Sequence, residues 1–151
     1  MDDRPIAMED VPDSYAKAIH IRAPIQSIFA MIATLEGIRA WWEGSVTGNA
    51  SEQGSLRFSL PDSDDYTQIR VDGVTFPSDV AWSVIEDSGF GGEWMGTNIL
   101  FHLDEDVDGS CVLTLHHDGL TPALDCFIDC RSGWDRHLEG IRKGAETTSE
   151  D

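Results

Sequence analysis

Residues 126–141 read CFIDCRSGWDRHLEGI, and this stretch decides how the rest of the chain is interpreted. Cys126 and Cys130 are four residues apart, which on a helix places the two thiols one turn apart on the same face. Such a pair is consistent with a metal or redox site. It is equally consistent with the apolar face of a helix that packs over a larger surface.

The cysteine content favours buried thiols over a metal or redox pair. The chain has three cysteines, Cys111, Cys126 and Cys130, and an odd number speaks against a disulfide framework. A structural zinc site needs four ligands, and the available histidines, His116 and His117, point to opposite faces if they lie in a strand. We therefore expect no metal and no cofactor, with the cysteines packed as small apolar side chains.

Apolar residues recur at helical spacing through and around the quoted stretch. They are Leu124, Phe127, Cys130, Trp134, Leu138 and Ile141, with Cys126 at the margin of the stripe. A long amphipathic helix is therefore predicted here. Gly133 in its interior costs about 1 kcal/mol relative to alanine, which indicates a bend or a close approach at that position.

The preceding sequence predicts a strand, two short helices and a series of strands. Residues 15–22 alternate, residues 23–35 carry one apolar helical face, and a second short helix follows a break at Gly37. Further runs with period two, typical of an antiparallel sheet with one covered face, are 55–60, 66–76, 79–87, 96–106 and 109–120.

The composition limits the partners and the location of the protein. The formal net charge is -18 over 151 residues, and such a surface repels phosphate backbones and anionic lipid, so we expect neither nucleic acid nor membrane as partner. The N-terminal residues lack the basic start and apolar block of a signal peptide. We expect a cytoplasmic protein, a monomer or weak dimer, with one domain at 14–143 between disordered tails at 1–13 and 144–151.

In this order the residues resemble the START-like (SRPBCC) superfamily and, within it, the family named for the activator of heat-shock protein 90 ATPase. The similar motifs are IRAPIQSIFAMIA (21–33), IRAWWEG (38–44), GSLRFSL (54–60), EWMGTNILFHL (93–103), VLTLHHDGL (112–120) and CRSGWDRHLEGI (130–141). The resemblance implies an α+β helix-grip (START/Bet v 1-like) fold. In that fold a curved antiparallel sheet of about six to seven strands grips a long C-terminal helix, with two short helices after the first strand.

The resemblance also implies a cavity between the sheet and the last helix. The residues expected to line it and bind a ligand are Trp41, Phe58, Trp82, Phe101, Leu115, His117, Phe127, Cys130 and Trp134. Such a lining suits an apolar ligand held by a few polar contacts, with Trp42 joining Trp41 as a lid. The same rings would also serve simply to fill a core. Glu43 and Glu93, which flank the aromatic positions, are expected to face water.

Three functions remain open on this basis. We favour non-enzymatic binding of a small hydrophobic molecule, without catalytic residues, because the sequence has no local signature of a nucleophile or a phosphate loop. One alternative is an enzyme of the polyketide cyclase or hydrolase type, found among members of the superfamily, with His117 as its acid–base group. The other is a chaperone-associated interaction domain that acts through the acidic surface.

Overall fold

The computed structural model describes residues 14–89 and 91–150, and the predicted tail at 1–13 lies outside them. Within these residues the elements are β1 (Tyr15–Ile21), α2 (Ile25–Ala33), α3 (Leu35–Trp41), β2 (Ser45–Gly48), β3 (Ser55–Ser59), β4 (Tyr66–Thr75), β5 (Asp79–Asp87), β6 (Asn98–Glu105), β7 (Cys111–Asp118) and α4 (Phe127–Glu150). The predicted order of a strand, two short helices, further strands and a long last helix is confirmed.

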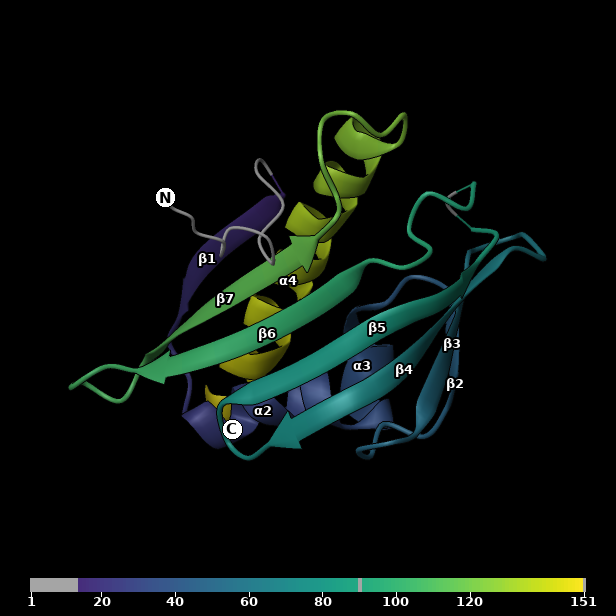
Figure 1. Cartoon of the computed structure of the whole chain (residues 1–151). Coiled ribbons are helices and arrows are strands. Elements are labelled where there is room, and N and C mark those ends of the chain that lie inside the picture. Colours follow the sequence, from purple (N-terminus) through teal and green to yellow (C-terminus); the bar gives the residue numbers. More distant parts are fainter. Residues whose placement is uncertain (1–13, 90, 151) are drawn as a thin grey trace, which may run out of the picture.

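The strands form one antiparallel sheet in the order β1-β7-β6-β5-β4-β3-β2. Each strand from β2 onward pairs with the next along the chain, and β7 returns to pair with β1. Register shifts at Gln68/Ile69 and Val71/Gly73 interrupt the ladder between β4 and β5, and such irregularities increase bending and twist. The three helices lie on one face of the curved sheet, with α4 running behind β6 and β7 (Figure 1).

The period-two pattern correctly identified the covered face of the sheet. Val80, Trp82 and Val84 of β5 are all buried, and so are Leu56 and Phe58 of β3. The core therefore lies between this face and α4. One strand was missed, because β2 has only four residues and a single buried side chain, too few to show alternation.

The last helix is longer than predicted. Its buried stripe includes the expected Cys130, Trp134, Leu138 and Ile141. The predicted tail from residue 144 is wrong, because α4 continues through Glu150. Ala145 extends the stripe by one turn and is buried, and Glu146 Oε2 accepts the backbone N–H of Arg22 at 2.9 Å. These contacts hold the last turns of the helix against the start of the domain.

The break between the first two helices lies at Thr34 rather than at Gly37. Thr34 Oγ1 accepts the Gly37 N–H at 2.9 Å and so caps the start of α3. Gly37 itself is helical, and a Cβ at this position would lie 2.0 Å from the carbonyl oxygen of Ala30. The glycine is therefore required for the close approach of α3 to the end of α2.

We expect Gly37→Ala to destabilise the fold by about 1–3 kcal/mol, because the added methyl group overlaps backbone atoms of α2. This direction is opposite to the preference of about 1 kcal/mol for alanine over glycine in a helix. The measurement is the free energy of unfolding in urea. Gly133→Ala in α4 is the control, since the nearest atom to its Cβ would be Arg136 Nη2 at 3.9 Å. Stabilisation by both substitutions would contradict the steric explanation.

Candidate functional site

Two cavities lie between the sheet and the first half of α4, and three tryptophans separate them. The outer cavity has a volume of about 100 Å³ and opens at the surface beside Glu43 and Asp129. The inner cavity has a volume of about 20 Å³ and is lined by buried side chains of α3 and the sheet, Trp82 among them. Trp42, Trp94 and Trp134 line both cavities. Movement of these rings would join the two spaces.

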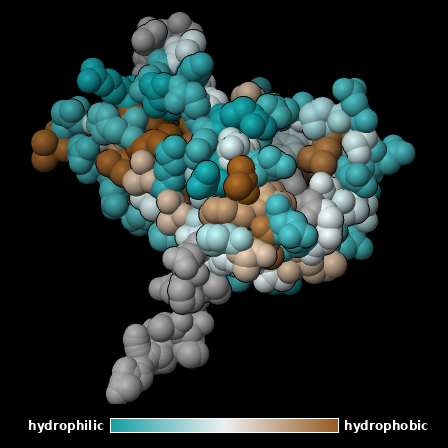
Figure 2. Space-filling model, turned by 90° about the horizontal axis from the view of Figure 1, so that it is seen from above, coloured by the Kyte–Doolittle hydropathy of each residue, from teal (hydrophilic) through white to brown (hydrophobic). Residues whose placement is uncertain are grey.

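The outer cavity lies at the end of the molecule where α4 begins. The loop between β5 and β6 and the first turns of α4 gather at this end (Figure 1). Figure 2 views the molecule from this end and shows apolar atoms emerging at several places in a mainly hydrophilic surface. Met95 of the loop is 54% exposed and Ile128 of α4 is 66% exposed. Apolar side chains therefore form part of the exposed surface at this end of the molecule.

The residues predicted to bind a ligand are brought together, but they fill most of the space between sheet and helix. Those that line the inner cavity are Trp41, Phe58, Trp82 and Trp134, while Cys130 and Trp134 line the outer one. Phe101, Leu115 and His117 are fully buried and line neither of these cavities. Phe127 is half-buried at the start of α4 and lines neither of them.

Direct ring contacts explain the small inner volume. The Trp82 ring lies 5.0 Å from that of Phe101 and 5.5 Å from that of Phe58, measured between centroids. A space of about 20 Å³ holds roughly one water molecule, whereas pockets for drug-sized ligands measure about 300–1,000 Å³. In this structure the predicted cavity is therefore closed by aromatic packing.

His117 is part of a buried chain of hydrogen bonds. Its Nδ1 accepts the Trp134 Nε1–H at 3.0 Å, and its Nε2 lies 2.8 Å from Thr97 Oγ1. The Thr97 hydroxyl donates to the Trp94 carbonyl at 2.6 Å, so the proton between Thr97 and His117 belongs to Nε2. Burial lowers the pKa of His117 to about 3. The ring is neutral with both nitrogens occupied, an arrangement that does not support His117 as an acid–base group.

The cysteines of the opening stretch are protonated thiols. Burial is the largest cause that raises the pKa of Cys126 far above its usual value, and the contacts with Cys130 and Glu93 raise it further. Burial also raises the pKa of Cys130. Because the thiolate is the form that attacks disulfides and binds metals, these thiols are unreactive in the folded protein. Among the described residues, no three His, Cys, Asp or Glu side chains are placed to hold a metal ion.

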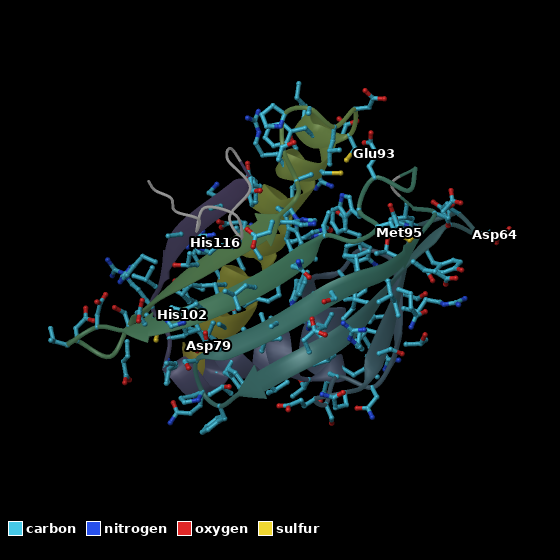
Figure 3. The ribbon with its side chains drawn as sticks, viewed as in Figure 1. Asp64, Asp79, Glu93, Met95, His102 and His116 are labelled. Carbon is cyan, nitrogen blue, oxygen red and sulfur yellow. The ribbon has the colours of Figure 1, made fainter. Side chains whose placement is uncertain are left out.

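Glu93, which was expected to face water, caps the start of α4. Its carboxylate accepts the backbone N–H of Cys126 at 2.8 Å and that of Asp125 at 3.0 Å. These two hydrogen bonds lower the pKa of Glu93. Figure 3 shows the side chain beside the first turn of the helix, where the helix dipole favours a negative charge. Glu93 thus connects the β5–β6 loop to the helix that it faces.

The neighbouring Trp94 is held by contacts to both the sheet and the helix. Its backbone N–H donates to Asp87 Oδ2 at 3.1 Å, and its indole N–H donates to Cys130 Sγ at 3.2 Å. The other oxygen of Asp87 accepts the Thr67 hydroxyl at 2.9 Å. The Trp94 ring is nearly parallel to that of Trp134, with centroids 6.0 Å apart. These contacts place Trp94 as a wall of both cavities.

His137, like Trp94, lines the site and was not among the residues predicted to bind a ligand. It lines the outer cavity, is only 8% exposed, and its ring centroid lies 4.9 Å from that of Trp42. Burial is the main cause that lowers its pKa to about 4, so the ring is neutral at pH 7. The location of His137 on the buried face of the helix could have been predicted, because residues 134, 137, 138 and 141 follow the same i, i+3, i+4, i+7 spacing as the predicted stripe.

A separate polar cluster lies on the outer face of the sheet. His102 Nδ1 is 2.9 Å from Asp79 Oδ2, and its Nε2 is 3.1 Å from Asp104 Oδ1 (Figure 3). The hydrogen bond with Asp79 is the largest cause that raises the pKa of His102. All three side chains are substantially exposed, so the cluster is a surface ion pair that contributes little to stability.

In the part of the chain that the structure describes, no helix combines the length and apolar character needed to cross a bilayer.

We expect the buried His117 to make stability depend on pH. The folded-state pKa lies below the value of about 6.5 in an unfolded chain, so its contribution is complete above pH 6.5 and is lost as pH falls toward 3. From pH 7.5 to pH 5 this loss is about 2 kcal/mol. In His117→Gln, which keeps a donor and an acceptor, the fall in unfolding free energy over that range should be smaller by this amount. An unchanged fall, measured by urea denaturation, would contradict the assignment.

The comparisons with known proteins establish the fold. No family model matches the sequence, and no curated protein matches it. Among solved structures, the Aha1 dimer from Colwellia psychrerythraea has 21% identity and a TM-score of 0.74, over 88% of this chain and 96% of that one. CalU16 from Micromonospora echinospora has 16% identity and a TM-score of 0.68, over 89% and 80%. MLL2253 from Mesorhizobium loti has 12% identity and a TM-score of 0.76, over 89% and 98%.

These similarities, all below 25% identity, concern the arrangement of the chain and not its activity. They agree with the element order, the antiparallel sheet and the single long helix on its concave side. The chain has the helix-grip fold that its sequence predicted, in which a curved antiparallel sheet packs around a long C-terminal helix.

Proposed function

We propose that the protein binds a small hydrophobic molecule between the sheet and α4, without converting it, and that the molecule enters through the outer cavity. The observation that carries this proposal is the glycine at position 133. It lies inside α4 and lines the outer cavity, and apart from its chain neighbours and the nearby backbone of the helix, the nearest atom to an ideal Cβ position is Arg136 Nη2 at 3.9 Å.

At position 37 a close contact with the backbone of another helix explains the glycine, and no such contact is present at position 133. A glycine inside a helix costs about 1 kcal/mol relative to alanine, and at position 37 overlap with backbone atoms explains the choice. At position 133 an alanine would fit, and its methyl group would take up space at the cavity wall. We infer that the glycine at position 133 keeps the outer cavity open and does not serve to stabilise the helix.

The size and lining of the site favour a single apolar ring. An enclosed apolar cavity of about 150 Å³ is enough for benzene. The outer and inner cavities, of about 100 and 20 Å³, approach this volume when the tryptophan rings between them shift slightly. Indole rings offer flat apolar surfaces against which an aromatic molecule packs well.

Neither alternative function has a comparable structural basis. The enzyme hypothesis relied on His117, whose two nitrogens are occupied by Trp134 and Thr97. The interaction hypothesis relies on the acidic surface and on a resemblance that the solved structures support at the level of the fold. A binding site is therefore the function that the geometry supports best.

We expect Gly133→Val to weaken the binding of 4-methylanisole, an uncharged single-ring probe, by about tenfold or more, because the side chain occupies the outer cavity. A loss of about 1.4 kcal/mol of binding free energy gives this factor. Gly133→Ala should combine a more stable fold with weaker binding, as expected where a residue serves function at the expense of stability. Affinity is measured by calorimetry and by the quenching of tryptophan fluorescence.

Ser132→Val is the matched control, because Ser132 is exposed on α4 and does not line either cavity. It should bind the probe as the wild type does. Wild-type affinity in Gly133→Val, in a protein shown by circular dichroism to be folded, would remove the basis of the proposal.

A further inference from the structure

The outer cavity contains a buried polar group without a complete set of partners. His137 is more than nine-tenths buried and lines this cavity. Its ring lies against the rings of Trp41, Trp42 and Trp134, with centroids 5.5, 4.9 and 5.8 Å away. Within residues 14–89 and 91–150 no side-chain hydrogen bond to the ring is found. A neutral imidazole has one donor nitrogen and one acceptor nitrogen.

The surroundings of the cavity disfavour a negatively charged ligand. Glu43 and Asp129 are exposed carboxylates that line it, and Arg136, the cation at the same site, lies with its Nε 3.4 Å from Glu43 Oε2. The whole chain carries a formal net charge of -18. An anion entering this site meets repulsion from the protein as a whole and a guanidinium that already has a carboxylate partner.

We propose, on the basis of the function proposed above, that the outer cavity takes a small uncharged aromatic molecule with one hydrogen-bond donor, of the phenol or indole class. The ring lies against Trp42, Trp94 and Trp134, and the donor points to the acceptor nitrogen of His137. A buried acceptor left unpaired is unfavourable, so a ligand O–H or N–H at this position is selected over an ether of the same shape.

The experiment compares three probes of similar size: p-cresol, 4-methylanisole and p-toluate. Affinities are measured by calorimetry and by chemical-shift changes of the tryptophan indole N–H groups at pH 7.5. We expect p-cresol to bind about three- to tenfold more tightly than 4-methylanisole, the range for one hydrogen bond. We expect p-toluate to bind most weakly, with an affinity that rises as salt screens the negative charge of the protein.

Two histidine variants test whether His137 causes the preference. In His137→Phe, which keeps a ring but removes the acceptor, the two uncharged probes should bind with equal affinity. His137→Asn keeps an acceptor in a smaller side chain and should retain part of the preference. His116→Phe is the matched control, because His116 is exposed on β7 (Figure 3) and the same chemical change there should leave the preference intact.

The outcomes separate this inference from the proposal on which it depends. Equal or tighter binding of 4-methylanisole by the wild type would overturn the role of His137 and leave the hydrophobic site standing. Tightest binding of p-toluate would assign recognition to Arg136 and overturn the uncharged class of ligand. A preference for p-cresol that survives in folded His137→Phe would also overturn the inference. Absence of binding by all three probes would overturn both the inference and the proposed function.

Discussion

The buried hydrogen bond between His117 and Trp134 is the contact on which the arrangement of sheet and helix depends. Apolar packing between α4 and the sheet is strong but not directional, so it allows small rotations and shifts of the helix. The hydrogen bond from the Trp134 indole to His117 has a length of 3.0 Å, and Thr97 fixes the other side of the ring. A helix displaced by a fraction of a turn would leave these polar groups buried and unpaired, at a cost of about 1–3 kcal/mol each.

This contact also determines the shape of the candidate site. Trp134 lines both cavities, and it is in contact with the rings of Trp41, Trp94 and His137. Its indole orientation therefore decides how much space remains on either side. Both histidines of this region are neutral because burial disfavours the charged form. They differ in that His117 has both nitrogens occupied inside the protein, whereas His137 retains an acceptor at the outer cavity.

The fold was predictable because the helix and strand periodicities continue over many residues. The stripe through Cys130, Trp134 and Leu138 and the alternation in β5 each depend on several side chains, so a single exception does not hide them. Short or local features were not predictable in the same way. Strand β2 has four residues, and Gly37 indicated a helix break that Thr34 provides through its side chain.

The site was predictable only in part, because membership of a buried face does not reveal which residues border empty space. Phe101 and Leu115 face inward as expected, yet they are packed in the core and border neither cavity. His137 lies on the same helical face as Trp134, but helical spacing alone does not distinguish a residue that lines the cavity from one packed in the core. The roles of Glu93 and of the sulfur of Cys130 depend on contacts with residues more than thirty positions away, which no local pattern contains.

For the proposed ligand to reach the inner cavity, one of the three shared tryptophans has to move, and their contacts indicate which one. Trp134 is fixed by a buried hydrogen bond and by the helix that carries it. Trp94 lies in a loop between Gly92 and Gly96, both at positive φ, and its indole donates to a sulfur atom, which is a weak acceptor. Trp42 is half-buried just after α3 and donates to the carbonyl of Ser59 at 3.0 Å. Displacing the Trp94 ring sacrifices the weakest indole hydrogen bond of the three, so this ring is the part of the wall that moves at least cost, while Glu93 and Asp87 hold the backbone beside it.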